Sequence, residues 1–276
     1  MLKLFKESFK ITNDCIILVT PLIIFLSILS WYINFAFNSI DDVKKLLLGV
    51  FTLFIMFCGF LASWLYMAKK TIALSKKVYI FEKDRANDFL KLLLTLPRGL
   101  GKLFIPIIGV VAVYIIVYCG LYWVLNYFIS KYVGYIDLSN IDFDSLALSS
   151  KELISFINDL DISDMKVFTI WYFTSSIIVN LVTFLTVLWI PEIVYNTQNA
   201  FKALFSSVKK VFKNFKNILI LYIFMFIVLK ILSIINTLLL FIPVMYFFVL
   251  IITYYFLVYL VVLLFTYYDR NFTNEE

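Results

Sequence analysis

Lys230 is the residue of this 276-residue chain whose position most demands a chemical explanation. It is the one ionisable side chain in the middle of a long apolar run, IVLKILSIIN. A lysine at mid-depth in a bilayer costs about 2.5–3.5 kcal/mol on insertion scales, so its ammonium group needs a polar partner or has to extend to the bilayer surface. The sequence leaves two interpretations open: a structural lysine that extends outward, or a contact to an anionic substrate or lipid phosphate. Ser233 follows three positions later, but nothing else supports a Ser-Lys nucleophile pair.

The candidate partners for such a lysine are two asparagines in apolar runs, backbone carbonyls, or a carboxylate from the outer loop. Asn180 and Asn236 both lie in or at the end of a predicted membrane span. Hydrogen bonding between helices is the ordinary role of such residues, at about 0.6 kcal/mol on average. The sequence therefore predicts that Lys230, Asn180 and Asn236 are the intramembrane polar residues.

The sequence contains no recognisable catalytic, nucleotide-binding or metal-binding motif. The chain has no histidine, no aspartate or glutamate within a predicted span, and no glycine-rich nucleotide-binding motif. The three cysteines have no CxxC spacing. Asn140, Asp142 and Asp144 alternate as in an EF-hand, but Lys151 occupies the position of the calcium-binding glutamate. We therefore expect no catalytic residue, no cofactor and no metal, and a protein that is not an enzyme.

The composition places all these residues in a membrane protein. Hydrophobic residues make up 63% of the chain and charged residues 15%, against roughly 25% charged residues in soluble domains. Too little polar surface remains to cover a soluble core. In a soluble protein, the net charge of +6 would suggest nucleic-acid binding. Here the charge comes from basic residues in the loops between the predicted spans, and no nucleic-acid partner is expected.

Six apolar runs reach the ~20 residues that a bilayer core of ~30 Å requires of a helix. The stretch 218–268 is too long for one span and suits two spans joined by a tight turn between Asn236 and Pro243. The fold class is therefore an all-α integral membrane protein, a single polytopic domain with an acidic outer loop at 130–166. The predicted spans are about 15–37, 46–68, 103–129, 167–190, 218–240 and 244–268.

Lysine and arginine fix the orientation of these spans, because cytoplasmic loops carry the excess of basic residues. Eighteen basic residues lie on the side of the termini and five on the other side. Both termini are predicted to be cytoplasmic. The bias toward lysine, isoleucine, asparagine and phenylalanine is typical of an AT-rich bacterial genome, which predicts a bacterial plasma membrane.

Asn199–Lys216 is the clearest surface helix, with apolar residues at helical spacing and lysines between them. Its lysines are predicted either to anchor on anionic headgroups, at about 1 kcal/mol each, or to contact a cytoplasmic protein partner such as an ATPase subunit. Similar basic helices are predicted at 2–10 and 86–96, the latter ended by LPRGLG. A three-fold repeat of one surface helix and two spans is a hypothesis. The lysines predicted to contact lipid or a partner are Lys202, Lys209, Lys210, Lys213 and Lys216.

Two segments resemble the membrane region of certain bacterial glycerophosphodiester phosphodiesterases and related stand-alone six-span proteins of unknown function. They are LLLTLPRGLGKLF (Leu92–Phe104) and WIPEIVYNTQNAFKALFSSVKKVFKNF (Trp189–Phe215), where that family has an acidic residue before a basic amphipathic helix. The resemblance covers residues 46–268. It implies architecture and no catalytic residue, because the family's catalysis belongs to a soluble barrel domain that this sequence lacks.

Together these observations predict a non-enzymatic multi-pass plasma-membrane protein that acts as a scaffold or accessory through lipid or partner contacts. The alternative is a transport permease subunit, similar to those of ABC exporters, for a hydrophobic or anionic substrate. An intramembrane enzyme is disfavoured by the missing catalytic groups. A polar cavity lined by Lys230, Asn180 and Asn236 would favour transport, and a solid apolar bundle would favour a scaffold.

Overall fold

The computed structural model describes residues 1–38, 42–77, 84, 87–88, 90–134, 162–239 and 242–273. These residues form helices and no strand. Six of the helical segments are long and apolar enough to cross a membrane, which confirms an all-α, multi-pass membrane protein. Their bounds are Ile16–Ala36, Val43–Ser75, Leu93–Tyr132, Ser163–Tyr195, Phe215–Leu239 and Val244–Phe272.

The helices group into two compact units. Unit 2 comprises Ala112–Phe184 and contains the second part of α5 (Leu96–Tyr132) and most of α8 (Ile162–Leu185). In it, the Trp171 indole donates to Oδ1 of Asn126 at 3.0 Å, and the hydroxyls of Tyr118 and Thr183 lie 3.4 Å apart, so two polar contacts join the largely apolar helices α5 and α8.

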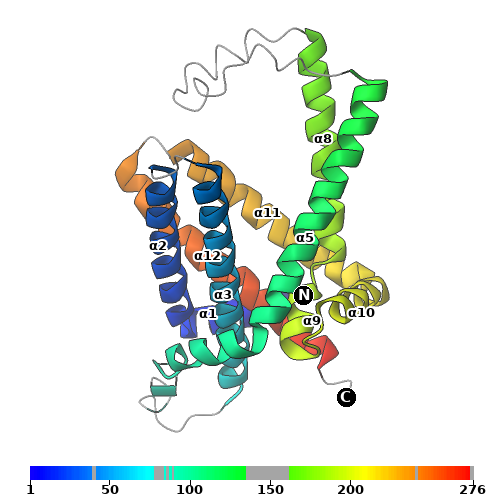
Figure 1. The fold of residues 1–276 in the computed structure, drawn as a ribbon. Helices are drawn as coiled ribbons and strands as arrows, with labels where there is room; N and C mark the ends of the chain where they lie inside the picture. The colour runs from blue at the N-terminus through cyan, green and yellow to red at the C-terminus, as the bar shows by residue number, and fades with distance from the viewer. Residues whose placement is uncertain are drawn as a thin grey trace. The chain divides into compact units, whose positions relative to one another are not determined.

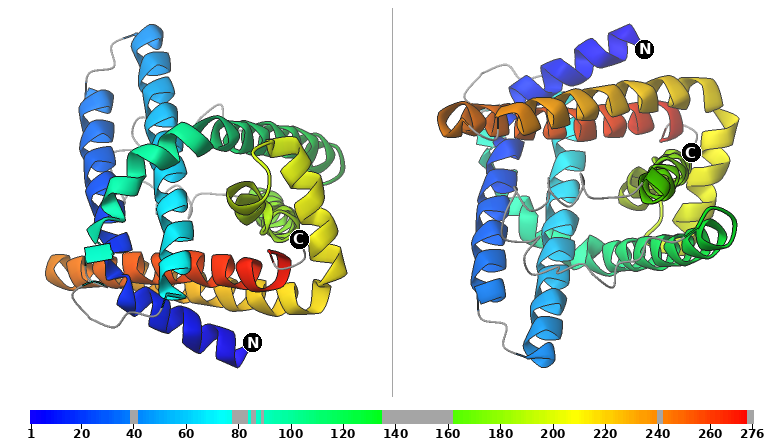
Figure 2. Two further views of the ribbon diagram at one scale, coloured as in Figure 1. Left: turned by 90° about the horizontal axis from the view of Figure 1, so that it is seen from below. Right: turned by 90° about the horizontal axis from the view of Figure 1, so that it is seen from above.

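Unit 1 comprises Met1–Val111 and Leu185–Glu276, so it brings together the two ends of the chain. The N-terminal helix α1 (Leu2–Asp14) lies against α12 (Pro243–Phe272), and α11 (Phe215–Leu239) runs beside α12, as Figures 1 and 2 show. Short helix η1 (Ile16–Leu18) leads into α2 (Val19–Asn38), which packs on α3 (Val43–Ser75). Short helices α9 (Trp189–Tyr195) and α10 (Ala200–Lys213) complete the unit.

The last two spans are separate helices, and the interval between them falls where the sequence predicts a turn. Helix α11 ends at Leu239, and α12 begins at Pro243, where the fixed φ of proline suits the first turn of a helix. The third helix, α3, is longer than predicted. Its 33 residues extend ~50 Å at 1.5 Å per residue, whereas a bilayer core is ~30 Å thick. The helix is therefore longer than the core is thick, and its C-terminal turns carry Lys69 and Lys70, with Lys76 as the cap.

The LPRGLG segment does not break the helix before the third span, so that prediction is wrong. Short helix η2 (Leu93–Thr95) leads into α5, which continues from Leu96 through both glycines. Gly99 serves a different purpose: a Cβ atom there would lie 2.8 Å from the Cα atom of Ser63 and 2.7 Å from the Cβ atom of Tyr66. The missing side chain lets α5 cross α3 at backbone contact distance, as small residues do between membrane helices.

Two predicted features lie partly outside the described residues. Residues 135–161 of the predicted outer loop are not described. Of the predicted surface helix at 86–96, residues 86 and 89 lie outside the described part, and its end is the short helix η2.

Candidate functional site

Three consecutive residues near the end of α12, Tyr268, Asp269 and Arg270, form the most connected polar group in unit 1. Successive residues of an α-helix point about 100° apart, so these three side chains leave α12 in three directions. Each reaches a different part of the unit: Tyr268 reaches α9 and α10, Asp269 reaches α3, and Arg270 reaches α1. We call these three residues and their partners the α12 clasp.

The Tyr268 arm contains a buried ion pair. The Lys210 ammonium lies 2.7 Å from Oε2 of Glu192, and it also donates to the Tyr268 hydroxyl at 2.7 Å. The Tyr268 hydroxyl donates in turn to Oε2 of Glu192. The side chain of Glu192 is 3% exposed and that of Lys210 is 20% exposed. An ion pair this deeply buried is stable only if its remaining hydrogen-bonding capacity is also satisfied.

The other carboxylate oxygen of Glu192 meets that requirement. Ser206 donates to Oε1 at 2.8 Å, and the Asn196 amide donates to it at 3.3 Å and to the Tyr268 hydroxyl at 2.7 Å. Every oxygen of the carboxylate thus accepts two hydrogen bonds. A carboxylate so fully engaged is suited to holding helices in place, because no oxygen is left to take a proton from a substrate.

Local sequence explains why Glu192 is turned inward. Helix α9 is only seven residues long, and its Trp189 indole donates to the backbone oxygen of Ala200 at 2.8 Å, which folds the connection to α10 back on itself. Asn199 caps α10 by accepting from the backbone amide of Lys202 at 3.0 Å. Ser206 and Lys210 lie four residues apart on α10, so both face the same carboxylate.

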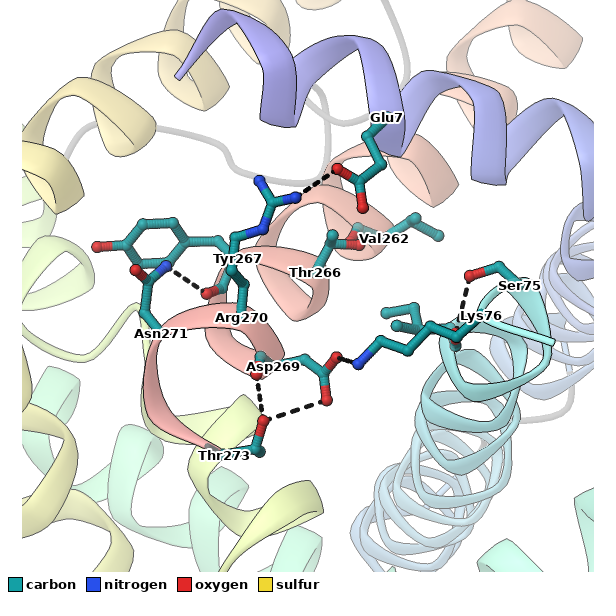
Figure 3. Close-up of polar contacts among 11 residues, drawn as sticks. Glu7, Ser75, Lys76, Val262, Thr266, Tyr267, Asp269, Arg270, Asn271 and Thr273 are labelled. Atoms are coloured by element: carbon teal, nitrogen blue, oxygen red, sulfur yellow. Dashed lines mark hydrogen bonds and ion pairs between the residues drawn. The ribbon is translucent and has the colours of Figure 1, made fainter. Parts of the chain in front are cut away.

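The other two arms are ion pairs nearer the surface (Figure 3). Asp269 pairs with Lys76 at the end of α3, and Arg270 pairs with Glu7 of α1 at 2.7 Å. The Asp269 carboxylate also accepts from Thr273. Because Glu7 and Arg270 are both about half exposed, their pair contributes little stability by itself, typically below ~1 kcal/mol.

The five predicted contact lysines of the surface helix do not share one environment. Lys202, Lys209, Lys213 and Lys216 are exposed, whereas the Lys210 ammonium is held by Glu192 and Tyr268 inside the clasp. Lys210 was predicted together with the other lysines because it also falls between the apolar positions of the helix. Its carboxylate partner comes from outside the helix, so the periodicity of α10 alone gave no sign of it.

The three predicted intramembrane polar residues also have separate surroundings. Lys230 is exposed on α11 with its ammonium 5.4 Å from the Phe226 ring centroid. Asn236 donates to Oγ1 of Thr253 at 2.9 Å and so joins α11 to α12, which is the interhelical bonding expected of it. Asn180, in unit 2, donates to the backbone oxygen of Ser176 one turn earlier on its own helix.

Sequence reasoning did not identify the clasp, although two signals pointed toward it. Glu192 is the acidic residue that precedes the basic helix in the resemblance described above. Asp269 and Arg270 are the opposite charges that end a long apolar run. Neither signal names a partner, because Glu7, Lys76, Glu192 and Lys210 are scattered over more than 200 residues of sequence. Comparison of the chain with protein-family models, with curated proteins and with solved structures gives no match.

Proposed function

We propose that the chain is a non-enzymatic multi-pass protein of a bacterial plasma membrane, with both termini in the cytoplasm. It acts as a membrane scaffold or accessory through basic surface helices that contact lipid or a protein partner. The proposal rests on the division of the α10 surface into three faces: one packs on the protein, one is aromatic and one carries lysines. The clasp supports it, because it holds α10 firmly against the membrane-spanning part of unit 1.

Each face of α10 has its own residue type. Small residues face the protein, with Ala203 and Ser207 fully buried. Large aromatic side chains are exposed on the second face, 61% for Phe201, 74% for Phe205 and 63% for Phe212. Exposed lysines form the third face. At 3.6 residues per turn, the aromatic and lysine faces lie roughly 130° and 210° around the axis from the protein face. A helix at a membrane surface needs this division, with phenylalanines toward acyl chains and lysines toward headgroups.

The N-terminal helix α1 repeats the pattern in the same rotational order. Its buried residues are Leu4, Ser8, Ile11 and Thr12. The apolar residues Leu2 and Phe9 are 71% and 45% exposed on a second face, where the Phe9 ring also contacts α12, and Lys3, Lys6 and Lys10 are exposed on a third. These faces lie roughly 125° and 210° around from the buried one at 3.6 residues per turn. Two helices with the same order of faces support the hypothesis that unit 1 contains a repeated surface helix.

A depth measurement tests the proposal. In a variant without native cysteines, a polarity-sensitive fluorophore is attached at Phe205→Cys or at Lys209→Cys, and the full chain is reconstituted in vesicles of anionic and zwitterionic phospholipid. We expect the probe at 205 to be quenched by lipid-borne nitroxide and the probe at 209 by aqueous iodide. A probe at Ile231→Cys, exposed on α11, provides the reference for full burial in lipid.

Charge reversal separates anchoring from partner binding. The triple change of Lys202, Lys209 and Lys213 to glutamate should move the probe at 205 toward water in anionic vesicles, because each lysine near the surface contributes about 1 kcal/mol. In zwitterionic vesicles it should change little. Equal quenching of 205 and 209 by iodide in every vesicle would refute the surface-helix proposal.

A further inference from the structure

We propose that unit 1 binds an anionic phospholipid at the crossing of α3 and α5, with an acyl chain in an apolar groove and the phosphate at Lys70 and Lys102. This inference rests on the proposed function, since it specifies one lipid contact of the protein. It concerns other helices than α10 and stands on two features that meet at Gly99, a groove and a group of lysines.

The groove is about 710 Å³ in volume and lies among α2, α3, η2 and α5. Its walls are almost entirely apolar. Ile24 and Ile28 in the α2 wall are 55% and 48% exposed, so the groove opens on the surface of the unit. A groove of this volume and lining accepts a hydrocarbon chain. Among the residues that line it are Phe25, Ile55, Phe60, Leu100 and Phe104.

Positive charges gather beside the groove. The ammonium groups of Lys70 on α3 and Lys102 on α5 both lie 5.7 Å from the centroid of the same Tyr66 ring. Lys69, which donates to the backbone oxygen of Val194 at 2.7 Å, is close enough to interact electrostatically with both. Lys70 and Lys102 thus share one ring, and Lys69 lies beside them at the Tyr195 ring, 4.7 Å from its centroid.

The nearby acidic group does not neutralise them. Asp269 acts electrostatically on Lys69, but its carboxylate pairs with Lys76. Within the residues that the structure describes, no carboxylate forms an ion pair with Lys70 or Lys102. Like charges at short range repel, and an anion between them would remove the repulsion. A phosphate group, which lysine binds as a point charge, has this chemistry.

The groove and the lysines adjoin along one face of α3. Gly59 and Ser63 line the groove, and Tyr66 and Lys70 follow Ser63 at three and seven positions, which places them on the same side of the helix. Gly99 of α5 meets both Ser63 and Tyr66 at the crossing. An apolar channel that leads to a cationic group matches the two parts of a phospholipid, and the charge selects an anionic one.

Native mass spectrometry of the full chain in detergent tests the proposal, with phosphatidylglycerol and phosphatidylcholine of identical acyl chains as probes. Lys70→Gln with Lys102→Gln should weaken the tightest phosphatidylglycerol site about 25-fold, at about fivefold for each lysine, and leave phosphatidylcholine unchanged. The matched control, Lys44→Gln with Lys45→Gln, removes equal charge from the other end of α3 and should leave that site intact. Gly59→Leu should fill the groove and weaken the binding of both lipids. A Cβ atom at position 59 makes only ordinary contacts, at 3.5 Å or more, so the helices need not move apart.

Several results would overturn the inference. One is equal affinity of the wild type for the two lipids, and another is an unchanged site in the Lys70/Lys102 variant. Displacement of phosphatidylglycerol by inorganic phosphate at equal concentration would indicate a free-phosphate site instead. If Gly59→Leu leaves the affinity for both lipids unchanged, the acyl chain does not occupy the groove. These substitutions leave α10 untouched, so the two experiments fail independently. A failed depth measurement at Phe205 would contradict the proposed function, and a failed lipid titration would contradict the phospholipid site.

Discussion

The two charges of the Glu192–Lys210 pair differ in their access to water, and this difference determines which substitution costs more. Lys210→Met leaves the carboxylate of Glu192, only 3% exposed, without its counter-charge. Removing one partner of a buried pair costs about 3–5 kcal/mol. Glu192→Gln leaves an ammonium that is 20% exposed and keeps the Tyr268 hydroxyl as an acceptor, so we expect about 1–3 kcal/mol. Lys210→Met should therefore be the more destabilising change.

Thermal unfolding in detergent, followed with a thiol-reactive dye, measures this order. Cys15 and Cys58 are fully buried and report unfolding, whereas exposed Cys119 is first replaced by serine. The double variant, Glu192→Gln with Lys210→Met, should lie closer to the wild type than the sum of the single effects. Equal or reversed midpoints of the two single variants would show that the pair is not held as described.

The two glycines of LPRGLG offer a matched pair of substitutions. Gly99→Ala places a Cβ atom 2.7–2.8 Å from α3 and forces the helices apart, at about 1–3 kcal/mol for overpacking. Gly101 has no heavy atom within 4 Å of the equivalent position, and alanine is the better helix former by roughly 0.5–1 kcal/mol. The dye assay should show a lower midpoint for Gly99→Ala and an equal or higher one for Gly101→Ala. A loss of stability at both positions would contradict the close crossing.

At the scale of elements, the arms of the clasp should contribute unequally to holding the surface helices. Tyr268→Phe removes a hydroxyl that donates to Glu192 and accepts from Lys210 and Asn196. We expect it to cost about 1–3 kcal/mol, as buried unsatisfied groups do. Arg270→Ala breaks a half-exposed pair and should cost less than ~1 kcal/mol.

Hydrogen exchange distinguishes the arms by location. Tyr268→Phe should raise amide exchange in α9 and α10, and Arg270→Ala should raise it only in α1. Uniform changes across both regions in either variant would mean that the clasp acts as one unit rather than as separate arms.

Which elements could be predicted from the sequence depends on the range of the interactions that form them. The six spans and the turn before Pro243 follow from runs of apolar residues, a local property that hydropathy captures. The buried face of α1 was not predictable from its own residues, because Leu2 and Phe9 are as apolar as Leu4 and Ile11, yet only Leu4 and Ile11 are buried. Gly99 was misinterpreted for the same reason. Its role depends on Ser63 and Tyr66, more than 30 positions away.

At the scale of the whole molecule, the charges at the ends of the helices determine its orientation. In unit 1, α1 and the last turn of α12 are joined through Glu7 and Arg270, so the two termini lie at the same end of the unit. The exposed lysines of α1 and α10, together with Lys69, Lys70 and Lys76 at the end of α3, make up half of the eighteen basic residues on the side of the termini. By the positive-inside rule, this is the end that we propose to lie in the cytoplasm.

Cysteine accessibility in intact cells tests this orientation. In a variant without native cysteines, single cysteines replace Lys3, Lys213 and Asn271 on the terminal side, and Lys44 and Lys131 on the opposite side. A membrane-impermeant maleimide added to intact cells should label positions 44 and 131 and leave the other three unlabelled. In inside-out vesicles the pattern should reverse, which controls for intrinsic reactivity. Labelling of position 3 or 271 from outside would show that the topology is the opposite of the one proposed. It would also contradict the assignment of α10 to the cytoplasmic surface, because the same basic residues support both.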